Sequence, residues 1–383
     1  MQIDVSDIVN YTCYNQQPEH LRFVGKITEE LIVALNSISS PKESTFNTLD
    51  TIFKDVDWAE SFTKPLIILH LEFLHNDTII YIHEWLRQKC ADIENIGIVS
   101  SESHLKTWWN EWCAVMHQKS FFIVEFPFIY TDAWFRVSIG KNLLTEKSDI
   151  VEEKLSNLKY HYSYYAGTAH YNERSYVGLR VSELNDHCLF DSMYKLPNKQ
   201  SVIDYVEGIT YFKDQKTVDL ISSLYDKNTT NQEFNNTTIT TEPHVRQQAF
   251  QYNDFIWSND RCCFANITRE TKHDCLYPII TEKTFRAFWH HTICIPVCYQ
   301  SIATLEKSYG FKFPHDLFDY SYQFEKDFHT RINKLIVSLT NFVKSSTIEN
   351  LKDYYANNVG TFMHNAKIVK DMSMISERLY KGI

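Results

Sequence analysis

Glycine is scarce in this chain, with nine residues among 383. The sequence contains no GxGxxG fingerprint, no Walker loop and no GxSxG nucleophile elbow. These absences exclude nucleotide sites that depend on a glycine-rich phosphate loop, and hydrolases that expose a serine on a tight glycine turn. They also predict turns that are unusually poor in glycine.

Long apolar runs and an excess of basic charge are lacking too. No stretch approaches about 18 uncharged apolar residues, and the N-terminal MQIDVSDIVN has neither the basic start nor the apolar core of a signal peptide. The formal net charge of −10 disfavours a protein whose main task is to bind polyanions. We therefore expect a soluble, cytoplasmic protein with no membrane partner.

Patterns of metal ligands are also missing. The nine cysteines include no CxxC, and HEWLR at 83–87 lacks the second histidine of HExxH. His290 and His291 are adjacent, so they would point to different faces of a helix. We expect no metal site and no cofactor, and most of the cysteines to be buried, reduced thiols.

Hydrophobic residues make up 44% of the chain and aromatic residues 15%, enough for well-filled cores. The length favours two domains. Apolar runs alternate with helix-like stretches, which predicts mostly parallel sheets flanked by helices. The predicted strands are 65–72, 96–99, 120–126, 160–168, 209–212, 261–268 and 293–299, and the predicted helices include 26–39, 77–89, 101–117, 146–159 and 172–184.

This alternation predicts an α/β fold of two doubly wound Rossmann-like domains that face a cleft, followed by C-terminal helices. The predicted bounds are 1–158 for an N-terminal domain, 159–345 for a C-terminal domain, and 346–383 for helices that could pack back on the N-terminal domain. Residues 226–242, rich in Asn and Thr, predict a mobile surface loop. Because such sheets bind ligands beyond the carboxyl ends of their strands, the cleft is the expected site.

The stretch ITEKTFRAF, residues 280–288, places an acid and a base directly after an apolar run. Thr281 is a good N-cap for a helix that begins with Glu282 and Lys283. The amides and the dipole at a helix N-terminus favour anions, and the Lys283 ammonium there could neutralise a diphosphate. The Glu282 carboxylate could accept hydrogen bonds from ribose hydroxyls. Alternatively, Glu282 merely stabilises the helix start and Lys283 is a solvated charge.

Two further features follow this stretch in order: an apolar strand with Pro296, and a segment with Gly310-Phe311 and Asp319-Tyr320-Ser321-Tyr322. Together the three resemble the donor-binding region of fucosyltransferase-type glycosyltransferases and of related viral and bacterial sequences. The resemblance covers roughly residues 260–335, with a weaker echo at 160–184. Where the family usually has Ala-Gly before the second strand, this chain has His290-His291.

The resemblance implies a GT-B-type enzyme and roles for particular residues. Glu282 is expected at the nucleotide ribose and Lys283 at the diphosphate. In similar transferases an arginine at the start of this domain neutralises the leaving diphosphate, a role that falls to Arg174, with Arg180 in reserve. Arg286 belongs to the same nucleotide-sugar-binding group. For these arginines the alternative is an ordinary place on the surface of an amphipathic helix.

A transferase of this kind also needs a base for the acceptor hydroxyl. Glu125 in FFIVEFPF and Glu72 in ILHLEF each interrupt an apolar stretch, where burial would raise the pKa of a carboxyl group. We prefer Glu125 because Pro127 turns the chain out of the sheet. A structural acid bonded to backbone amides is an equal alternative for both residues.

The leading hypothesis is therefore a nucleotide-sugar-dependent glycosyltransferase, inverting and metal-independent, that acts on a glycan or another hydroxyl acceptor. A second hypothesis is a viral enzyme that glycosylates hydroxymethylated DNA bases, which the acidic balance disfavours. The aromatic and basic residues that could form its DNA surface are Trp108, Trp109, Trp112, Lys119 and Arg136. A third hypothesis is a non-catalytic module that binds sugar nucleotides.

Overall fold

In the computed structural model the chain divides into two compact units, each of which we consider by itself. Unit 1 comprises Met1–Ser138 and Asp371–Ile383, and unit 2 comprises Ile139–Lys370. None of the helices in the described part is long and apolar enough to cross a lipid bilayer. The structure describes residues 22–26, 42–69, 76–100, 105–125, 150–166, 172–192, 198–230, 262–268, 278, 280 and 282–381.

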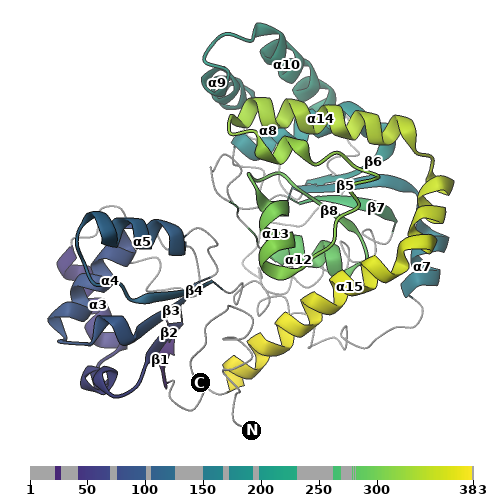
Figure 1. Cartoon of the computed structure of the whole chain (residues 1–383). Helices are drawn as coiled ribbons and strands as arrows, with labels where there is room; N and C mark the ends of the chain where they lie inside the picture. Colours follow the sequence, from purple (N-terminus) through teal and green to yellow (C-terminus); the bar gives the residue numbers. More distant parts are fainter. Residues whose placement is uncertain are drawn as a thin grey trace. The chain divides into compact units, whose positions relative to one another are not determined.

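Unit 1 holds a parallel sheet with helices in its connections. Its elements in chain order are β1 (Arg22–Lys26), α3 (Lys42–Ile52), η2 (Trp58–Phe62), β2 (Leu66–Leu69), α4 (Asn76–Gln88), η3 (Ile93–Asn95), β3 (Ile96–Ser100), α5 (Leu105–Val115) and β4 (Phe122–Glu125). The strand order in space, β1-β2-β3-β4, is also the order in the sequence. Right-handed crossovers that all step in one direction place their helices on one face, and Figure 1 shows α3, α4 and α5 on one side of these strands.

Aromatic rings fill the core of unit 1. Trp85 of α4 meets Trp58 edge to face, with the ring centroids 5.2 Å apart. Trp109 of α5 is fully buried and stacks on Phe121 at 4.5 Å. Such pairs stabilise a fold through the apolar area they bury and through their ring geometry.

One glycine is needed for packing in the middle of this sheet. All five residues of β3 are buried, and Gly97 lies between the side chains of both neighbouring strands. A Cβ atom added to Gly97 would lie 2.1 Å from Cε2 of Phe122 and 2.7 Å from Cδ1 of Ile67. The absence of a side chain at Gly97 therefore lets those two side chains cross the strand.

Unit 2 holds a second parallel sheet with more helices. Its elements are α7 (Ile150–Asn157), β5 (Tyr160–Ala166), α8 (Asn172–Val181), η4 (Ser182–His187), β6 (Cys188–Ser192), α9 (Lys199–Ile209), α10 (Gln215–Thr230), β7 (Cys263–Thr268), α12 (Glu282–Trp289), β8 (Ile293–Pro296), α13 (Ser301–Tyr309), η6 (Ser321–Phe324), α14 (Phe328–Ser345) and α15 (Ile348–Lys381). The strand order is β6-β5-β7-β8. From β5 the chain steps to one edge through α8, and from β7 it steps to the other edge through α12. Opposite steps with one handedness put these helices on opposite faces, as Figure 1 shows.

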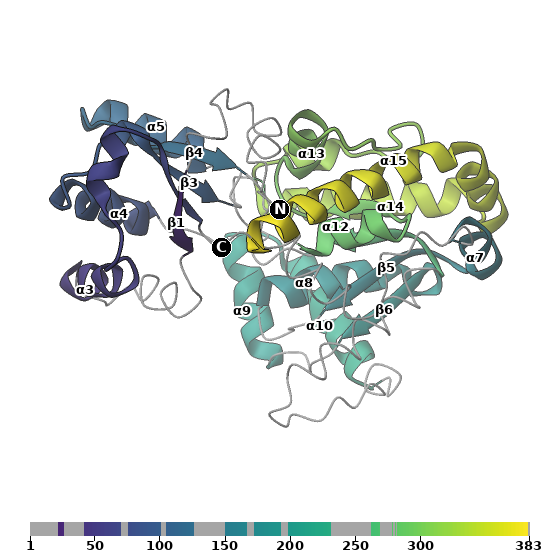
Figure 2. The same cartoon turned by 90° about the horizontal axis from the view of Figure 1, so that it is seen from below.

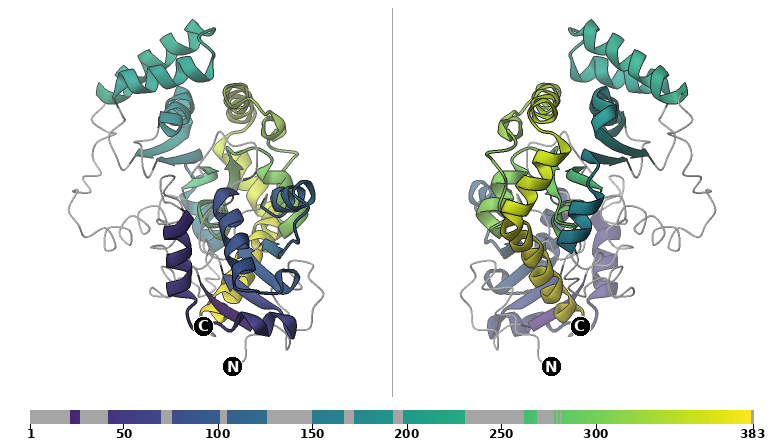
Figure 3. Two further views of the ribbon diagram at one scale, coloured as in Figure 1. Left: turned by 90° about the vertical axis from the view of Figure 1, so that its left-hand side faces the viewer. Right: turned by 90° about the vertical axis from the view of Figure 1, so that its right-hand side faces the viewer.

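Three further helices of unit 2 gather around α8. The Tyr176 hydroxyl of α8 is 2.8 Å from Nδ1 of His329, and Arg180 bonds to Asn333 one turn further along both helices. Because both partners advance by four residues, α8 and α14 run in parallel and their N-termini lie at the same end. α9 and α10 pack on each other and on α8. Figures 2 and 3 show α8, α9 and α10 close together.

The described cysteines differ in how far they are buried. Cys90 is exposed and Cys262 is half-buried. Burial raises the pKa of the Cys113 thiol, and of the Cys188 thiol well above its usual value. The fully or almost fully buried cysteines are Cys113, Cys188, Cys263, Cys294 and Cys298.

The prediction of parallel sheets flanked by helices is confirmed. The predicted strand at 209–212 is wrong, because α9 runs to Ile209 and a turn follows it. The predicted loop at 226–242 begins too early, since α10 continues to Thr230. β1 and β6 were not predicted. The helix expected at 26–39 and the rest of that loop lie outside the described residues, and the domain bounds and the cleft stay predictions.

Candidate functional site

The strand order of unit 2 reverses between β5 and β7, which pair directly in parallel. The chain leaves their carboxyl ends toward opposite edges of the sheet. Such a reversal leaves a crevice beyond the strand ends, and open α/β sheets bind their ligands there. α8 follows β5, and α12 follows β7 in the chain after a segment that lies mostly outside the described residues. α12 packs on both β7 and β8.

The predicted acid and base lie in the first turn of α12. The helix begins at Glu282 and Lys283 follows, as the sequence predicted. A helix N-terminus carries unsatisfied backbone amides and a partial positive charge that favour an anion. Arg286 is half-buried and belongs to the last turn, so it lies further from the strand ends. Thr281, the expected N-cap, lies outside the described residues.

Arg174 lies in the first turn of α8, at the same edge of the sheet. It is 5% exposed, although it carries a permanent charge. The hydroxyl of Tyr164, from β5, donates to the Arg174 carbonyl oxygen at 3.0 Å and ties the helix start to the strand. An arginine whose backbone is held beside a strand end is a candidate to neutralise phosphate charge.

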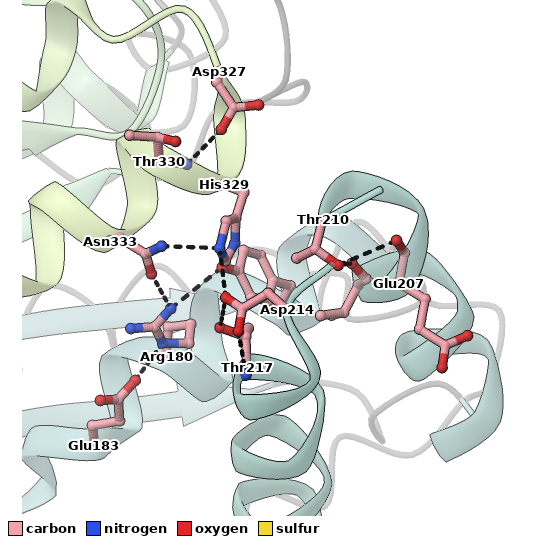
Figure 4. Close-up of polar contacts among 12 residues, drawn as sticks. Arg180, Glu183, Glu207, Thr210, Asp214, Thr217, Asp327, His329, Thr330 and Asn333 are labelled. Carbon is pink, nitrogen blue, oxygen red and sulfur yellow. Dashed lines mark hydrogen bonds and ion pairs between the residues drawn. The ribbon is translucent and has the colours of Figure 1, made fainter. Parts of the chain in front are cut away.

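Arg180, the reserve candidate, belongs to a polar network on the flank of α8 that Figure 4 draws. Its guanidinium pairs with Glu183 and donates to Asn333 and, at 3.4 Å, to the Tyr176 hydroxyl. Burial lowers the pKa of Arg180, but Tyr176 and Glu183 outweigh burial and raise it. Arg180 is thus occupied by protein groups that join α8 to α14.

A further cation, Arg331 in the first turns of α14, was not predicted from the sequence. Its side chain is fully buried, and Nη1 donates to the Glu325 carbonyl oxygen at 2.9 Å. The guanidinium carbon lies 5.4 Å from the Phe328 ring and 6.0 Å from the ring of Tyr299, which follows β8. The available signal was periodicity, because Arg331 falls on the face of α14 whose other residues are mainly apolar and buried.

The two candidate bases belong to unit 1. Glu125 is the last residue of β4 and pairs with Ser100, so it lies at the carboxyl end of its strand as expected. Glu72 lies outside the described residues. The assignment of a catalytic base therefore stays a prediction.

The His290-His291 pair, where the resembling family usually has Ala-Gly, has a structural explanation. His291 adopts φ 53, in the left-handed region that glycine fills most easily. Its Nδ1 shares a hydrogen bond of 2.8 Å with the Tyr355 hydroxyl, and burial, helped by the nearby Lys154 charge, lowers its pKa to about 4. His291 is therefore neutral near pH 7 and serves the turn into β8.

The described residues include no metal cluster, and one member of the predicted DNA surface is buried. No group of three or more His, Cys, Asp or Glu residues among them could hold a metal ion. Trp109 is fully buried in the core of unit 1, so it cannot stack on a nucleic-acid base. Arg136, another member of that predicted surface, lies outside the described residues.

A cavity of about 560 Å³ lies between α13, α14 and the segment 315–324. Its described lining includes the carboxylates of Glu306, Asp316 and Asp319 but no Lys or Arg. Such a lining repels a diphosphate. The cavity is thus unsuited to the phosphates of a nucleotide, in contrast to the reversal between β5 and β7.

No protein-family model matches the sequence, and no curated protein matches it. Among solved structures, a UDP-forming α,α-trehalose-phosphate synthase from Burkholderia vietnamiensis aligns with a TM-score of 0.37 and 8% identity, over 88% of this chain and 71% of that one. An α,α-trehalose 6-phosphate synthase from Burkholderia multivorans gives 0.37 and 9%, over 94% and 70%. A likeness this weak carries no argument about the function of this chain.

Proposed function

We propose that this chain is a glycosyltransferase that moves a sugar from a nucleotide-sugar donor to a hydroxyl acceptor. The observation that carries the proposal is the reversal of strand order in unit 2, where α8 and α12 are the helices that follow the two central strands β5 and β7 in the chain. One helix start carries Arg174 and the other carries Glu282 and Lys283. A carboxylate for ribose and cations for a diphosphate are what a sugar nucleotide requires.

In this proposal each residue has a distinct task. Glu282 accepts hydrogen bonds from the ribose hydroxyls, while Lys283 and the amides at the start of α12 hold the diphosphate. Arg174 neutralises the charge that develops on the leaving nucleoside diphosphate. Arg180 and Arg286 are secondary candidates.

The finer assignment rests on the sequence resemblance. A fucosyltransferase-like enzyme would invert the anomeric carbon by direct displacement, with Glu125 or Glu72 as the base for the acceptor. Protein cations and helix termini would do the work of a metal ion. The acceptor is a glycan or another hydroxyl compound, and glycosylation of DNA bases is the weaker alternative because Trp109 is buried.

Thermal unfolding with a panel of nucleoside diphosphates tests the donor site. A ligand at 100 times its Kd stabilises the native state by about 2.7 kcal/mol. Glu282→Ala should weaken nucleotide binding by about tenfold or more, because charge-assisted hydrogen bonds to the ribose are lost. The matched control is Glu349→Ala, which removes an exposed glutamate from the first turn of α15 and should change nothing.

The outcomes separate the hypotheses. If no nucleoside diphosphate raises the melting temperature, the proposal is rejected. If one does so but no nucleotide sugar is hydrolysed or transferred, the chain is a non-catalytic sugar-nucleotide-binding module. Donor hydrolysis that Glu282→Ala abolishes and Glu349→Ala leaves intact supports the enzyme.

A further inference from the structure

The turn between α9 and α10 exposes two adjacent aromatic side chains. Tyr211 is 71% exposed and Phe212 is 78% exposed, the highest values among the large hydrophobic residues of unit 2 that are exposed in the described part. Their backbones adopt φ 53 and φ 56, in the left-handed region. Bulky residues rarely adopt this conformation, which glycine or asparagine fills at lower cost. The fold therefore gains neither packing nor backbone stability from these two rings.

The turn itself is firmly held. The backbone amides of Tyr211 and Phe212 donate to carbonyl oxygens of α9 at 3.1 and 2.8 Å. On the other side, the Asp214 carboxylate accepts from the amide and hydroxyl of Thr217 at 3.1 and 2.6 Å, and it lies 3.2 Å from Nε2 of His329 (Figure 4). The Thr217 hydroxyl and amide lower the pKa of Asp214. The two rings are thus presented on a rigid support.

The place of the turn relates it to the candidate site within unit 2. His329 is the second residue of α14, and it bonds to Tyr176 in the second turn of α8. Both helices begin at the carboxyl edge of the sheet, beside the reversal of strand order. The exposed rings therefore lie on the side of unit 2 where the candidate donor site lies.

The charges at the tip of the turn are basic, although the whole chain carries −10. Lys213 and Lys216 are exposed, and the only acid between them, Asp214, is half-buried and remains ionised, so these three side chains carry two positive charges and one negative, a net charge of +1. The next acids, Glu207 and Asp219, lie about one turn back along α9 and α10. Aromatic rings flanked by lysines suit the interface of a bilayer with anionic lipids, where rings enter the headgroup region and lysines meet its negative charge.

We propose that the turn Thr210–Asp214, with Lys216, docks unit 2 on the surface of an anionic membrane through Tyr211 and Phe212. The inference deepens the proposed function and rests on it in one respect: the acceptor would be a hydroxyl compound carried by a lipid. Docking itself needs no nucleotide, so membrane binding and donor binding can fail separately.

Sedimentation with sucrose-loaded vesicles tests the proposal. The full chain should bind vesicles of phosphatidylcholine with phosphatidylserine, weakly bind phosphatidylcholine alone, and dissociate as salt is added. Tyr211→Asn/Phe212→Gly should lower binding by about tenfold or more, while relief of the left-handed strain leaves the melting temperature unchanged or raises it. Lys213→Gln/Lys216→Gln should cost about fivefold for each lysine, on phosphatidylserine vesicles only.

The matched control is Val115→Ser/Met116→Ser, a pair of adjacent apolar residues that are 75% and 50% exposed on unit 1. This control should bind vesicles as the unchanged chain does. The proposal is overturned if the unchanged chain binds neither kind of vesicle, or if the Tyr211/Phe212 variant binds as well as the control. It is also overturned if the turn instead joins two copies of the chain, seen as dimerisation that this variant abolishes without vesicles.

Discussion

The two sheets are built from the same unit, a strand, a helix and a parallel strand, but they are wound differently. The described strands of unit 1 follow one another across the sheet, whereas those of unit 2 start in the middle and step to both edges. Doubly wound topology is therefore present in unit 2 and absent from the described strands of unit 1. Since ligands bind where the winding reverses, a ligand site is expected in unit 2.

The interiors of the two units also differ, in the number of basic and imidazole side chains that are buried. In the described part of unit 1, His83 is the single buried Lys, Arg or His side chain, and it lies within an aromatic cluster. Burying charge is costly, so a fold retains it where it serves packing networks or a ligand. Unit 2 buries many such groups: Lys154, His161, Arg174, Arg180, His290, His291 and Arg331.

The largest effect is expected from breaking the aromatic core of unit 1. Trp109→Ala should lower the free energy of unfolding by about 3–5 kcal/mol, because it removes a buried indole and leaves a cavity. Urea denaturation followed by circular dichroism measures the change. The control is Trp108→Ala at the half-buried neighbour, which should cost clearly less. Equal costs would contradict the view that stacking on Phe121 stabilises this unit.

Acid should affect unit 2 through His291. Its pKa is lowered to about 4 in the native state, so the unfolded chain takes up a proton that the folded chain does not. The stability present above pH 6.5 should therefore decline by about 3 kcal/mol as the pH falls from about 6.5 to 4. Urea denaturation at several pH values measures this slope.

His291→Asn is the matched variant for that measurement. Asparagine tolerates φ 53 and offers an oxygen to the Tyr355 hydroxyl, but it does not titrate. Its stability should depend less on pH in this window. Some slope remains, because burial also lowers the pKa of His83 and of His161. An unchanged slope would show that His291 is not the group that senses acid.

The smallest effect is expected in the sheet of unit 1. Gly97→Ala would force its new methyl against Phe122 and Ile67 and should cost about 1–3 kcal/mol through overpacking. Gly97→Ala with Phe122→Leu, which shortens the nearer neighbour, should recover part of the loss. The urea midpoints of the single and double variants measure both changes in stability. If Gly97→Ala left the midpoint unchanged, the Phe122 and Ile67 side chains would move aside without cost.

Periodicity predicted most of the described elements, and it failed where local pattern and tertiary role diverge. β1 and β6 are short, and β1 begins with Arg22 and ends with Lys26, so neither stands out as an apolar run. ITYF at 209–212 is composed like a strand, yet Ile209 ends a helix and the two rings that follow are exposed. Composition alone could not reveal that those aromatic residues face solvent.

The candidate site was predictable in part. The start of α12 at Glu282 follows from an apolar run that ends in polar residues, a local signal. That β5 and β7, the strands before α8 and α12, lie side by side at the reversal depends on strand order, which no local pattern encodes. Arg331 was overlooked although periodicity places it on the apolar face of α14, because arginines are mostly exposed and only tertiary packing shows that this one is buried.

The distribution of the thiols makes it possible to label one unit selectively. Among the described cysteines, Cys90 is exposed, and it lies in unit 1 just after α4. The other described cysteines, in either unit, are buried or half-buried. Among the described cysteines, a maleimide dye would react first at this thiol under native conditions. With Cys13 and Cys275, which lie outside the described residues, replaced by serine, the reporter would follow the unfolding of unit 1 separately from that of unit 2.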